Sequence, residues 1–197
     1  ALRHDLTVLS DEIHADLVYA PHRHIPFASL SPEVASRTIT MTSATKSFNI
    51  AGLRFAIAIF GSDALRARFD SLPERIRGGL NSAGVAATEV AWRDCDDWLD
   101  GLVGYLGQNR DYLYERITQR MPAVTIRKPE ATFLSWLDCS ALGINGSPYE
   151  HFLNTAKVAF SDGEDFGEEG AGFVRLNFAT SREVLSKILD RVEDGVP

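Results

Sequence analysis

The chain has 197 residues, of which 45% are hydrophobic and 24% charged; this is enough apolar material for a folded core and excludes a disordered chain. The formal net charge of -7 argues against nucleic acid or an anionic membrane surface as a partner, because both would require clustered Lys and Arg. No apolar run approaches the roughly 18 residues of a membrane span, and no signal peptide is visible.

The two cysteines, Cys95 and Cys139, are too few for a disulfide framework and lack the spacing of a metal site. We therefore expect no bound metal, two reduced thiols packed as small core residues, and a cytoplasmic protein. The chain starts at Ala1 rather than Met, and a strand-like run begins already at Leu6. Because a domain rarely begins so abruptly, we expect the chain to be a fragment.

The first part of the chain has the pattern of an α/β fold. Short apolar and β-branched runs indicate strands, and Ser62 offers an N-cap for a helix that Pro73 interrupts. A segment with three prolines and two histidines separates the first two strands and is expected to be a loop. In chain order we expect a strand at 6–10, a loop at 20–32, strands at 37–43 and 53–60, and a helix at 62–72.

The remainder of the chain predicts a long helical stretch followed by a small α+β part. From residue 82 to about 121, apolar residues recur at three- and four-residue intervals, which predicts one long helix or a broken pair of helices. We place the domain boundary near residue 90, within this stretch. The later elements expected are strands at 124–127, 132–138, 158–160 and 173–179, a helix at 148–156, a loop at 163–172 rich in Gly and acidic residues, and a final helix opened by Thr180 or Ser181.

Asp11 follows the first predicted strand directly, in the sequence Ser-Asp-Glu-Ile-His-Ala-Asp-Leu at residues 10–17. Because α/β sheets bind ligands at the carboxyl ends of their strands, this carboxylate is well placed to meet a ligand. The alternative is a turn residue that ends the strand.

Lys46 lies between two predicted strands, among small and hydroxyl-bearing residues. A partly desolvated lysine can act as an imine-forming nucleophile, and nearby hydroxyls together with Arg54 could hold a phosphate. The alternative is an ordinary solvated loop lysine.

Arg175 interrupts an otherwise apolar strand at residues 173–179. An arginine within such a strand requires an anionic partner, which is either a ligand or a carboxylate of the protein itself.

Together these segments resemble the aspartate-aminotransferase-like class, fold type I, of pyridoxal-phosphate (PLP) enzymes. More narrowly, Ser-Asp-Glu-Ile-His-Ala-Asp-Leu at 10–17, Lys-Ser-Phe-Asn-Ile-Ala-Gly-Leu at 46–53 and Phe-Val-Arg-Leu-Asn-Phe-Ala at 173–179 resemble the MalY/PatB-type cystathionine β-lyases, within the class I/II aminotransferase family. The resemblance covers essentially the whole chain and corresponds to the C-terminal half of a family member. It implies that residues 1–90 are the end of the large α/β, PLP-binding domain, and that residues 91–197 are a bridging helix and the small α+β domain.

The resemblance also implies residue roles. Asp11 would pair with the pyridine nitrogen of PLP, Lys46 would form the Schiff base, and Ser43 and Arg54 would bind the phosphate. Arg175 would bind the α-carboxylate of the substrate. His14 stands where many relatives have a tyrosine that bonds the phenolic oxygen of the cofactor. Further candidates for lining the site are Tyr19, His24 and Phe48.

Other parts of the family's cofactor site do not occur in this chain. The family supplies an upstream phosphate-binding loop, an aromatic residue that stacks on the pyridine ring, and an Asn-Pro-x-x-Pro-Thr-Gly segment. With the site half built, we expect an isolated fragment to bind PLP poorly and to be inactive.

For the intact protein the resemblance implies a C–S β-lyase that acts on cystathionine or cysteine-type amino acids. A class I/II aminotransferase is the alternative within the family, because Lys46 would serve both reactions. A third hypothesis, from a different class, is a non-catalytic binding or regulatory module. The expected partners are the amino-acid substrate and a second copy of the protein in a homodimer.

Overall fold

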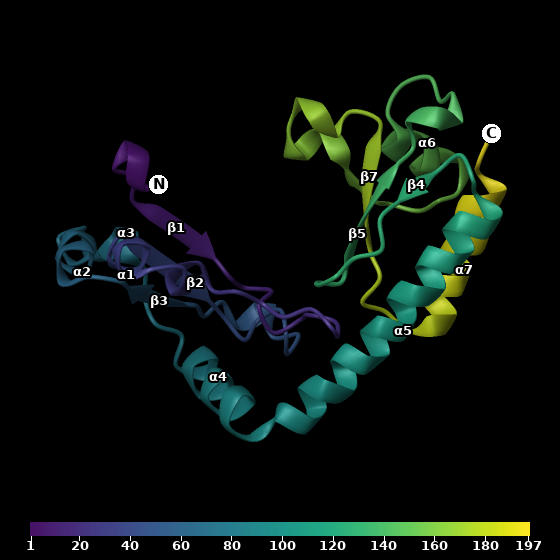
Figure 1. Ribbon diagram of the computed structural model, residues 1–197. Helices are drawn as coiled ribbons and strands as arrows, with labels where there is room; N and C mark the ends of the chain where they lie inside the picture. Colours follow the sequence, from purple (N-terminus) through teal and green to yellow (C-terminus); the bar gives the residue numbers. More distant parts are fainter. The chain divides into compact units, whose positions relative to one another are not determined.

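The computed structural model describes residues 1–197, which divide into two compact units, Ala1–Gly101 and Leu102–Pro197 (Figure 1). The division falls within the longest helix, α5 (Asp96–Arg120). The assignment of residues 1–90 to a large PLP-binding domain, and of residues 91–197 to a bridging helix and small domain, stays a prediction.

The first unit is built on a three-stranded sheet in the order β1-β2-β3, with strands Val8–Asp11, Thr38–Thr42 and Ile57–Phe60. β1 runs parallel to β2, and β3 runs antiparallel to both. In this register Asp11 lies opposite Met41, and Thr42 lies opposite Ile57. The carboxyl ends of β1 and β2 therefore share one edge of the sheet with the amino end of β3 (Figure 1).

Short capped helices accompany this sheet. Ser31 and Ser62 accept hydrogen bonds from the backbone of the first turns that follow them, as the sequence predicted for Ser62. The helical stretch after residue 82 is a broken pair, interrupted at Cys95. None of the helices is long and apolar enough to cross a bilayer. The helices of the first unit are α1 (Pro32–Ser36), α2 (Asp63–Asp70), α3 (Glu74–Arg77) and α4 (Ser82–Asp94).

The third strand is shorter than the apolar run that predicted it. Residues Ala51–Leu53 form a 3-10 turn, and Arg54 has a left-handed φ of 48°. Side chains satisfy the carbonyls of this segment, because Asn81 donates to the Leu53 oxygen at 2.7 Å and Ser43 donates to the Phe55 oxygen at 2.6 Å. With these backbone groups already paired, ladder bonding starts only at Ile57.

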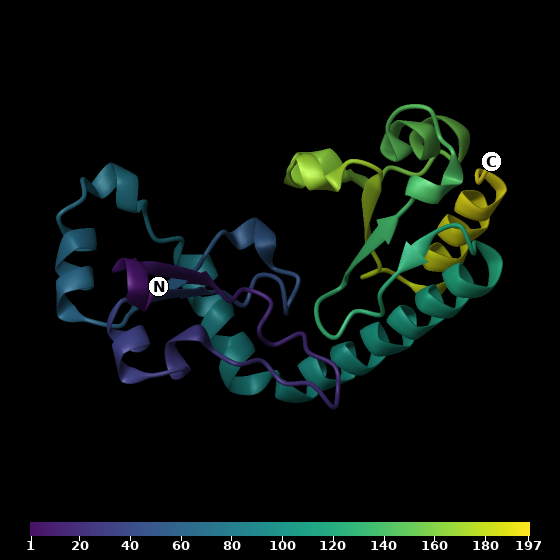
Figure 2. The same ribbon diagram turned by 45° about the horizontal axis from the view of Figure 1, so that its top comes forward.

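The second unit contains a four-stranded antiparallel sheet in the order β4-β5-β7-β6. The long helix α5 and the final helix α7 lie side by side along one face of this sheet (Figures 1 and 2). Alternate residues of β7, among them Val174 and Leu176, are buried on that face. The elements are β4 (Thr125–Ile126), β5 (Leu134–Asp138), α6 (Pro148–Thr155), β6 (Ser161–Asp162), β7 (Phe173–Asn177) and α7 (Arg182–Asp194).

The strand predicted at residues 158–160 is wrong, because pairing begins only at Ser161. Lys157 has a left-handed φ of 56°, which turns the chain sharply after α6. Phe160 is buried, but its ring packs edge-on against Phe152 with centroids 5.5 Å apart. The apolar residues of this segment are thus explained by packing against a helix rather than by a strand.

Asn109 of α5 fixes the start of α7. Its side chain is fully buried, and its amide nitrogen donates to the carbonyls of Phe178 at 3.1 Å and Thr180 at 2.8 Å. Its amide oxygen accepts a hydrogen bond from Arg182 Nε at 3.0 Å. This one amide therefore connects helix α5, the end of strand β7 and the first turn of α7.

We expect Asn109→Ala to lower the free energy of unfolding by about 2–4 kcal/mol, because it leaves two carbonyls and a charged donor without their partner. Urea unfolding of the variant measures this loss. Gln108→Ala is the matched control, since Gln108 is exposed on the same helix. Equal stability of the two variants would contradict the role given to Asn109.

Candidate functional site

The sheet of the first unit brings three of the predicted site residues to one edge. Asp11 is the last residue of β1, and Lys46 follows the end of β2 by four residues. Arg54 precedes β3 by three residues and leaves the sheet at the same edge, since β3 runs in the opposite direction. The topology thus gathers a carboxylate, an amine and a guanidinium where α/β sheets bind ligands.

Lys46 is exposed on a tight turn whose other side chains are largely buried. Ser43, Ala44, Thr45 and Ser47 are each no more than 7% exposed. The turn is closed by hydrogen bonds from the Phe48 amide to the Ala44 oxygen and from the Ile50 amide to the Thr45 oxygen. No hydrogen bond or ion pair engages the Lys46 amine, so it is accessible to an added ligand. The partial desolvation expected for this lysine is not seen, because its side chain is exposed.

The two residues predicted to bind phosphate differ in what they contact. Ser43 is buried, and its hydroxyl oxygen lies 2.6 Å from the Phe55 carbonyl and 2.9 Å from the Thr45 hydroxyl oxygen, while it accepts the Thr45 amide at 3.1 Å. Arg54 is exposed, and no acidic side chain pairs with it. Of the two, the guanidinium of Arg54 is therefore the group available for an anion.

The position of Arg54 depends on the start of helix α4. A Cβ atom on Gly84 would lie 2.8 Å from the Phe55 Cβ and 2.9 Å from the Leu53 oxygen. Such distances are shorter than real Cβ contacts, so only glycine lets α4 approach both the Leu53 carbonyl and the Phe55 Cβ, on either side of Arg54. Together with the bond from Asn81 to Leu53, this contact holds the segment in place.

Asp11 is exposed, and one of its carboxylate oxygens accepts the amide of Ile13 at 3.2 Å. The alternative considered for Asp11, a turn residue at the strand end, is thus realised. It does not compete with ligand binding, because a carboxylate has several acceptor positions. His14 lies half-buried in the turn that follows, where its carbonyl accepts the amide of Leu17 at 3.0 Å.

Sequence reasoning missed Glu12, whose side chain is only 8% exposed. It accepts hydrogen bonds from the Ser10 hydroxyl at 2.9 Å and the Phe27 amide at 3.0 Å, and its other oxygen lies 2.7 Å from His24 Nε2. Burial raises the pKa of Glu12, but the hydrogen bonds from His24, Phe27 and Ser10 outweigh it and hold the pKa below its ordinary value. The sequence carried no signal for this contact, because Glu12 and His24 are 12 positions apart and their spacing follows no helix or strand period.

Glu12 ties the loop that carries His24 to the residue beside Asp11, and this gives a pH dependence. Because its folded pKa is lowered, ionised Glu12 stabilises the fold above its ordinary pKa, and this stability is lost as pH falls through the folded value. We expect Glu12→Gln to be less stable than the parent near pH 7 and the difference to shrink below about pH 4.

Urea unfolding at a series of pH values measures this prediction. Glu115→Gln, a change at an exposed position of α5, is the control and should shift stability little. A stability difference for Glu12→Gln that is the same at all pH values would show that the carboxylate's charge is not the cause.

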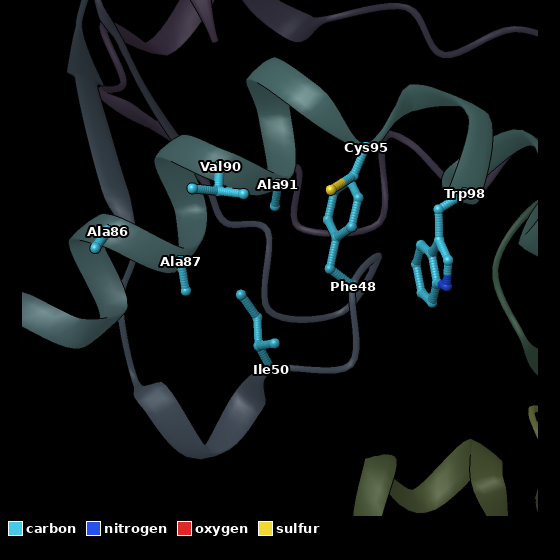
Figure 3. Close-up of a pocket in the computed structure, with 8 residues that line it drawn as sticks. All are labelled: Phe48, Ile50, Ala86, Ala87, Val90, Ala91, Cys95 and Trp98. Atoms are coloured by element: carbon cyan, nitrogen blue, oxygen red, sulfur yellow. The ribbon is translucent and has the colours of Figure 1, made fainter.

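Two contacts position the Lys46 turn from either side. The Ser47 hydroxyl, fully buried, donates to Asp16 at 2.8 Å, which connects the turn to the segment after Asp11. On the other side Phe48 stacks on Trp98, with ring centroids 5.5 Å apart and planes 21° apart. Phe48 thus lines an open, apolar hollow of about 520 Å³ between the turn, α4 and the start of α5 (Figure 3).

Arg175 belongs to the second unit and lies on the open face of its sheet, half-buried. Its Nη2 donates to the Ser161 hydroxyl at 3.1 Å, and its guanidinium carbon lies 4.5 Å from the centroid of the Phe166 ring. No carboxylate of the chain pairs with it, so the alternative of an internal ion pair is wrong. The guanidinium retains donors for an external anion.

The chemistry of these groups fits PLP. A free amine matches an aldehyde, a guanidinium matches a phosphate, and an exposed carboxylate at the same sheet edge matches a basic ring nitrogen. In the second unit, the guanidinium of Arg175 matches an amino-acid carboxylate.

Comparison with known proteins gives consistent results. The sequence profile of the family "aminotransferase class I and II" matches residues 1–192. Cystathionine β-lyase PatB of Bacillus subtilis is 39% identical over 194 residues, which cover 98% of this chain and 50% of that protein. An aspartate aminotransferase of Pyrococcus horikoshii is 26% identical over 98% of this chain and 49% of its own length.

Among solved structures, cystalysin of Treponema denticola, which contains pyridoxal 5'-phosphate, matches with a TM-score of 0.93 at 31% identity. The match covers 98% of this chain and 50% of cystalysin. The resemblance found in the sequence and the α/β fold of PLP-dependent transferases are thereby confirmed. The chain spans about half the length of the curated relatives that it matches.

Proposed function

The chain belongs to the class I and II aminotransferase family, and from this premise we propose that the whole protein is a PLP-dependent C–S β-lyase. Its substrate would be cystathionine or another cysteine-type amino acid. The observation that carries the proposal is the free amine of Lys46, held on a buried turn at the sheet edge that also carries Asp11 and Arg54.

Each residue of the site has one task in this proposal. Lys46 holds the cofactor covalently through Nζ, Asp11 pairs with its ring nitrogen, and Arg54 binds its phosphate. Ser43 stays a predicted phosphate ligand, and its bonds with the Phe55 carbonyl and the Thr45 amide hold the start of the Lys46 turn in place. The remaining residues act on other groups: His14 on the phenolic oxygen of the cofactor, and Arg175 on the α-carboxylate of the substrate.

The bound PLP would supply an electron sink for the electron pair left at Cα. Lys46 Nζ would act as the base that removes the proton from Cα. The bond between Cβ and sulfur then breaks, and the sulfur leaves as a thiol. With one water consumed, the remaining carbon skeleton becomes pyruvate and the nitrogen becomes ammonia.

The relatives support the lyase over the aminotransferase. PatB, named a cystathionine β-lyase, is 39% identical to this chain over the aligned residues, whereas the aspartate aminotransferase of P. horikoshii is 26% identical. A non-catalytic module would have no use for a free lysine on a buried turn. We further propose a homodimer and a cytoplasmic location, with the first unit as the end of the large domain and the second as the small domain.

Trapping with borohydride tests the cofactor site. Reduction of the whole protein after addition of stoichiometric PLP should place a pyridoxyl group on Lys46 alone, as peptide mass spectrometry locates it. Lys46→Arg keeps the positive charge but not the primary amine, so trapping should vanish and release of pyruvate from cystathionine should fall on the order of 10³-fold.

The matched control is Lys157→Arg, because Lys157 is exposed and donates only to the Asn154 carbonyl, at 2.8 Å. It should trap PLP and release pyruvate like the parent. Transfer of the amino group to a keto acid without pyruvate release would identify an aminotransferase instead. Label spread over several lysines would remove the basis of the enzyme proposal.

Arg54→Gln separates cofactor binding from chemistry. Loss of the guanidinium should weaken PLP binding roughly 10- to 100-fold, because a charge-assisted pair with the phosphate is lost. With PLP at saturation, the turnover number should change little. A variant with unchanged PLP affinity would show that another group binds the phosphate.

A further inference from the structure

The loop at residues 163–170 lies against Arg175 and is rich in acidic residues, but the residue that contacts the arginine is aromatic. Between Gly163 and Gly170 its sequence is Glu-Asp-Phe-Gly-Glu-Glu. None of the four acidic side chains pairs with Arg175, and the only apolar side chain, Phe166, lies over the guanidinium with 4.5 Å between the guanidinium carbon and the ring centroid. The loop thus places an aromatic ring where an acid would neutralise the arginine.

The backbone of this loop fixes the ring in that place. Gly163 and Gly170 approach so closely that a Cβ atom on either would lie about 2 Å from the carbonyl oxygen of the other, at 2.1 and 1.9 Å. Between them, Gly167 has a φ of 123°, a conformation that favours glycine. The loop therefore has one close-packed form, and Phe166 at the end of its first 3-10 turn is held by it.

A second aromatic residue supports Phe166 from the side. The edge of Phe166 meets the ring of Trp136, with centroids 5.4 Å apart and planes 86° apart. Trp136 is the residue of β5 directly opposite Arg175 in the sheet, and it stacks in turn on Phe173. Phe166 is thus packed between its own loop and the sheet, although 53% of its surface is exposed.

This packing limits how an anion can reach Arg175. The N–H groups of a guanidinium point outward in its plane, and an aromatic ring over one face attracts the cation without using any of them. Ser161 accepts one N–H from the edge. A ligand must therefore approach in the plane, from the remaining edge, which is the geometry of a bidentate pair with a carboxylate.

We propose that Phe166 is a positioning residue that orients Arg175 for in-plane, bidentate binding of the substrate's α-carboxylate and keeps the loop's own carboxylates away from it. The inference rests on the proposed function for the role of Arg175. It extends that function by assigning the selectivity for a carboxylate to Phe166 as well as to the arginine.

Steady-state kinetics of the whole protein test this role. Phe166→Leu should raise KM for cystathionine about 10-fold, equivalent to about 1.4 kcal/mol, with kcat within about twofold of the parent. Phe166→Tyr keeps the ring and should restore KM. Phe166→Glu should raise KM further than Phe166→Leu, because an internal carboxylate then competes for Arg175.

Two comparisons distinguish positioning from a general structural effect. A cysteine S-conjugate whose α-carboxylate is replaced by a carboxamide offers no anion, so Phe166→Leu should leave its kcat/KM unchanged within about twofold. Phe173→Leu removes another ring of the same cluster that stacks on Trp136, and it should leave KM for cystathionine near the parent value. The proposal would be overturned if Phe166→Leu lowered kcat/KM equally for the carboxylate and the carboxamide substrate. It would also be overturned if Phe166→Leu and Phe173→Leu raised KM for cystathionine equally.

A chemical measurement keeps the test independent of turnover. Phenylglyoxal reacts with guanidinium groups, and peptide mass spectrometry compares its rate at Arg175 with that at Arg68, which is exposed on α2. Phe166→Leu should speed modification of Arg175 several-fold, and Phe166→Tyr should not. If the parent protein releases no pyruvate, the proposed function fails. If Phe166→Leu leaves the rate of Arg175 modification unchanged, the positioning role of Phe166 fails, whatever the result for pyruvate.

Discussion

The parallel pairing of β1 with β2 is the constraint on which the candidate site depends. Because these strands run in the same direction, the residues that follow them leave the sheet at one edge. Asp11 and Lys46, 35 positions apart in the sequence, are brought to that edge by four register pairs from Val8–Thr38 to Asp11–Met41. β3 returns antiparallel and adds Arg54 from its amino end. A slip of one residue would turn every side chain of β1 to the other face.

Buried polar side chains convert this shared edge into a fixed arrangement. Ser43 and Ser47 use their hydroxyls inside the protein, one on the Phe55 carbonyl and the other on Asp16. Glu12 does the same for the loop that carries His24. Since unsatisfied buried groups are costly, each of these bonds resists displacement of the turn. The side chains of Lys46 and Arg54 are exposed at this edge and form no hydrogen bond or ion pair within the protein.

Much of this arrangement could be predicted from the sequence. The apolar runs located the three strands of the first unit, and the motifs around Asp11, Lys46 and Arg175 identified the family. The limits of β3 and the false strand at residues 158–160 could not be predicted. In both places the apolar residues lie in or beside turns and pack through their side chains, without forming the hydrogen-bonded ladder of a strand. Hydrophobic patterning does not distinguish such a turn from a buried strand.

Contacts between residues distant in the sequence could not be predicted, for the same reason. The pairing of Glu12 with His24 depends on how a loop folds back, and the cover of Phe166 on Arg175 depends on a close approach of two glycines. Sequence patterning reports periodic burial within an element. It carries no distance between a loop and the side chain against which that loop packs.

A crystal structure of the whole protein with bound PLP tests the central claim most directly. We predict continuous density from Lys46 Nζ to the cofactor, the Asp11 carboxylate within hydrogen-bonding distance of the ring nitrogen, and Arg54 on the phosphate. PLP attached to another lysine, or an Asp11 carboxylate turned away from the ring nitrogen, would contradict the view that this sheet edge is the cofactor site.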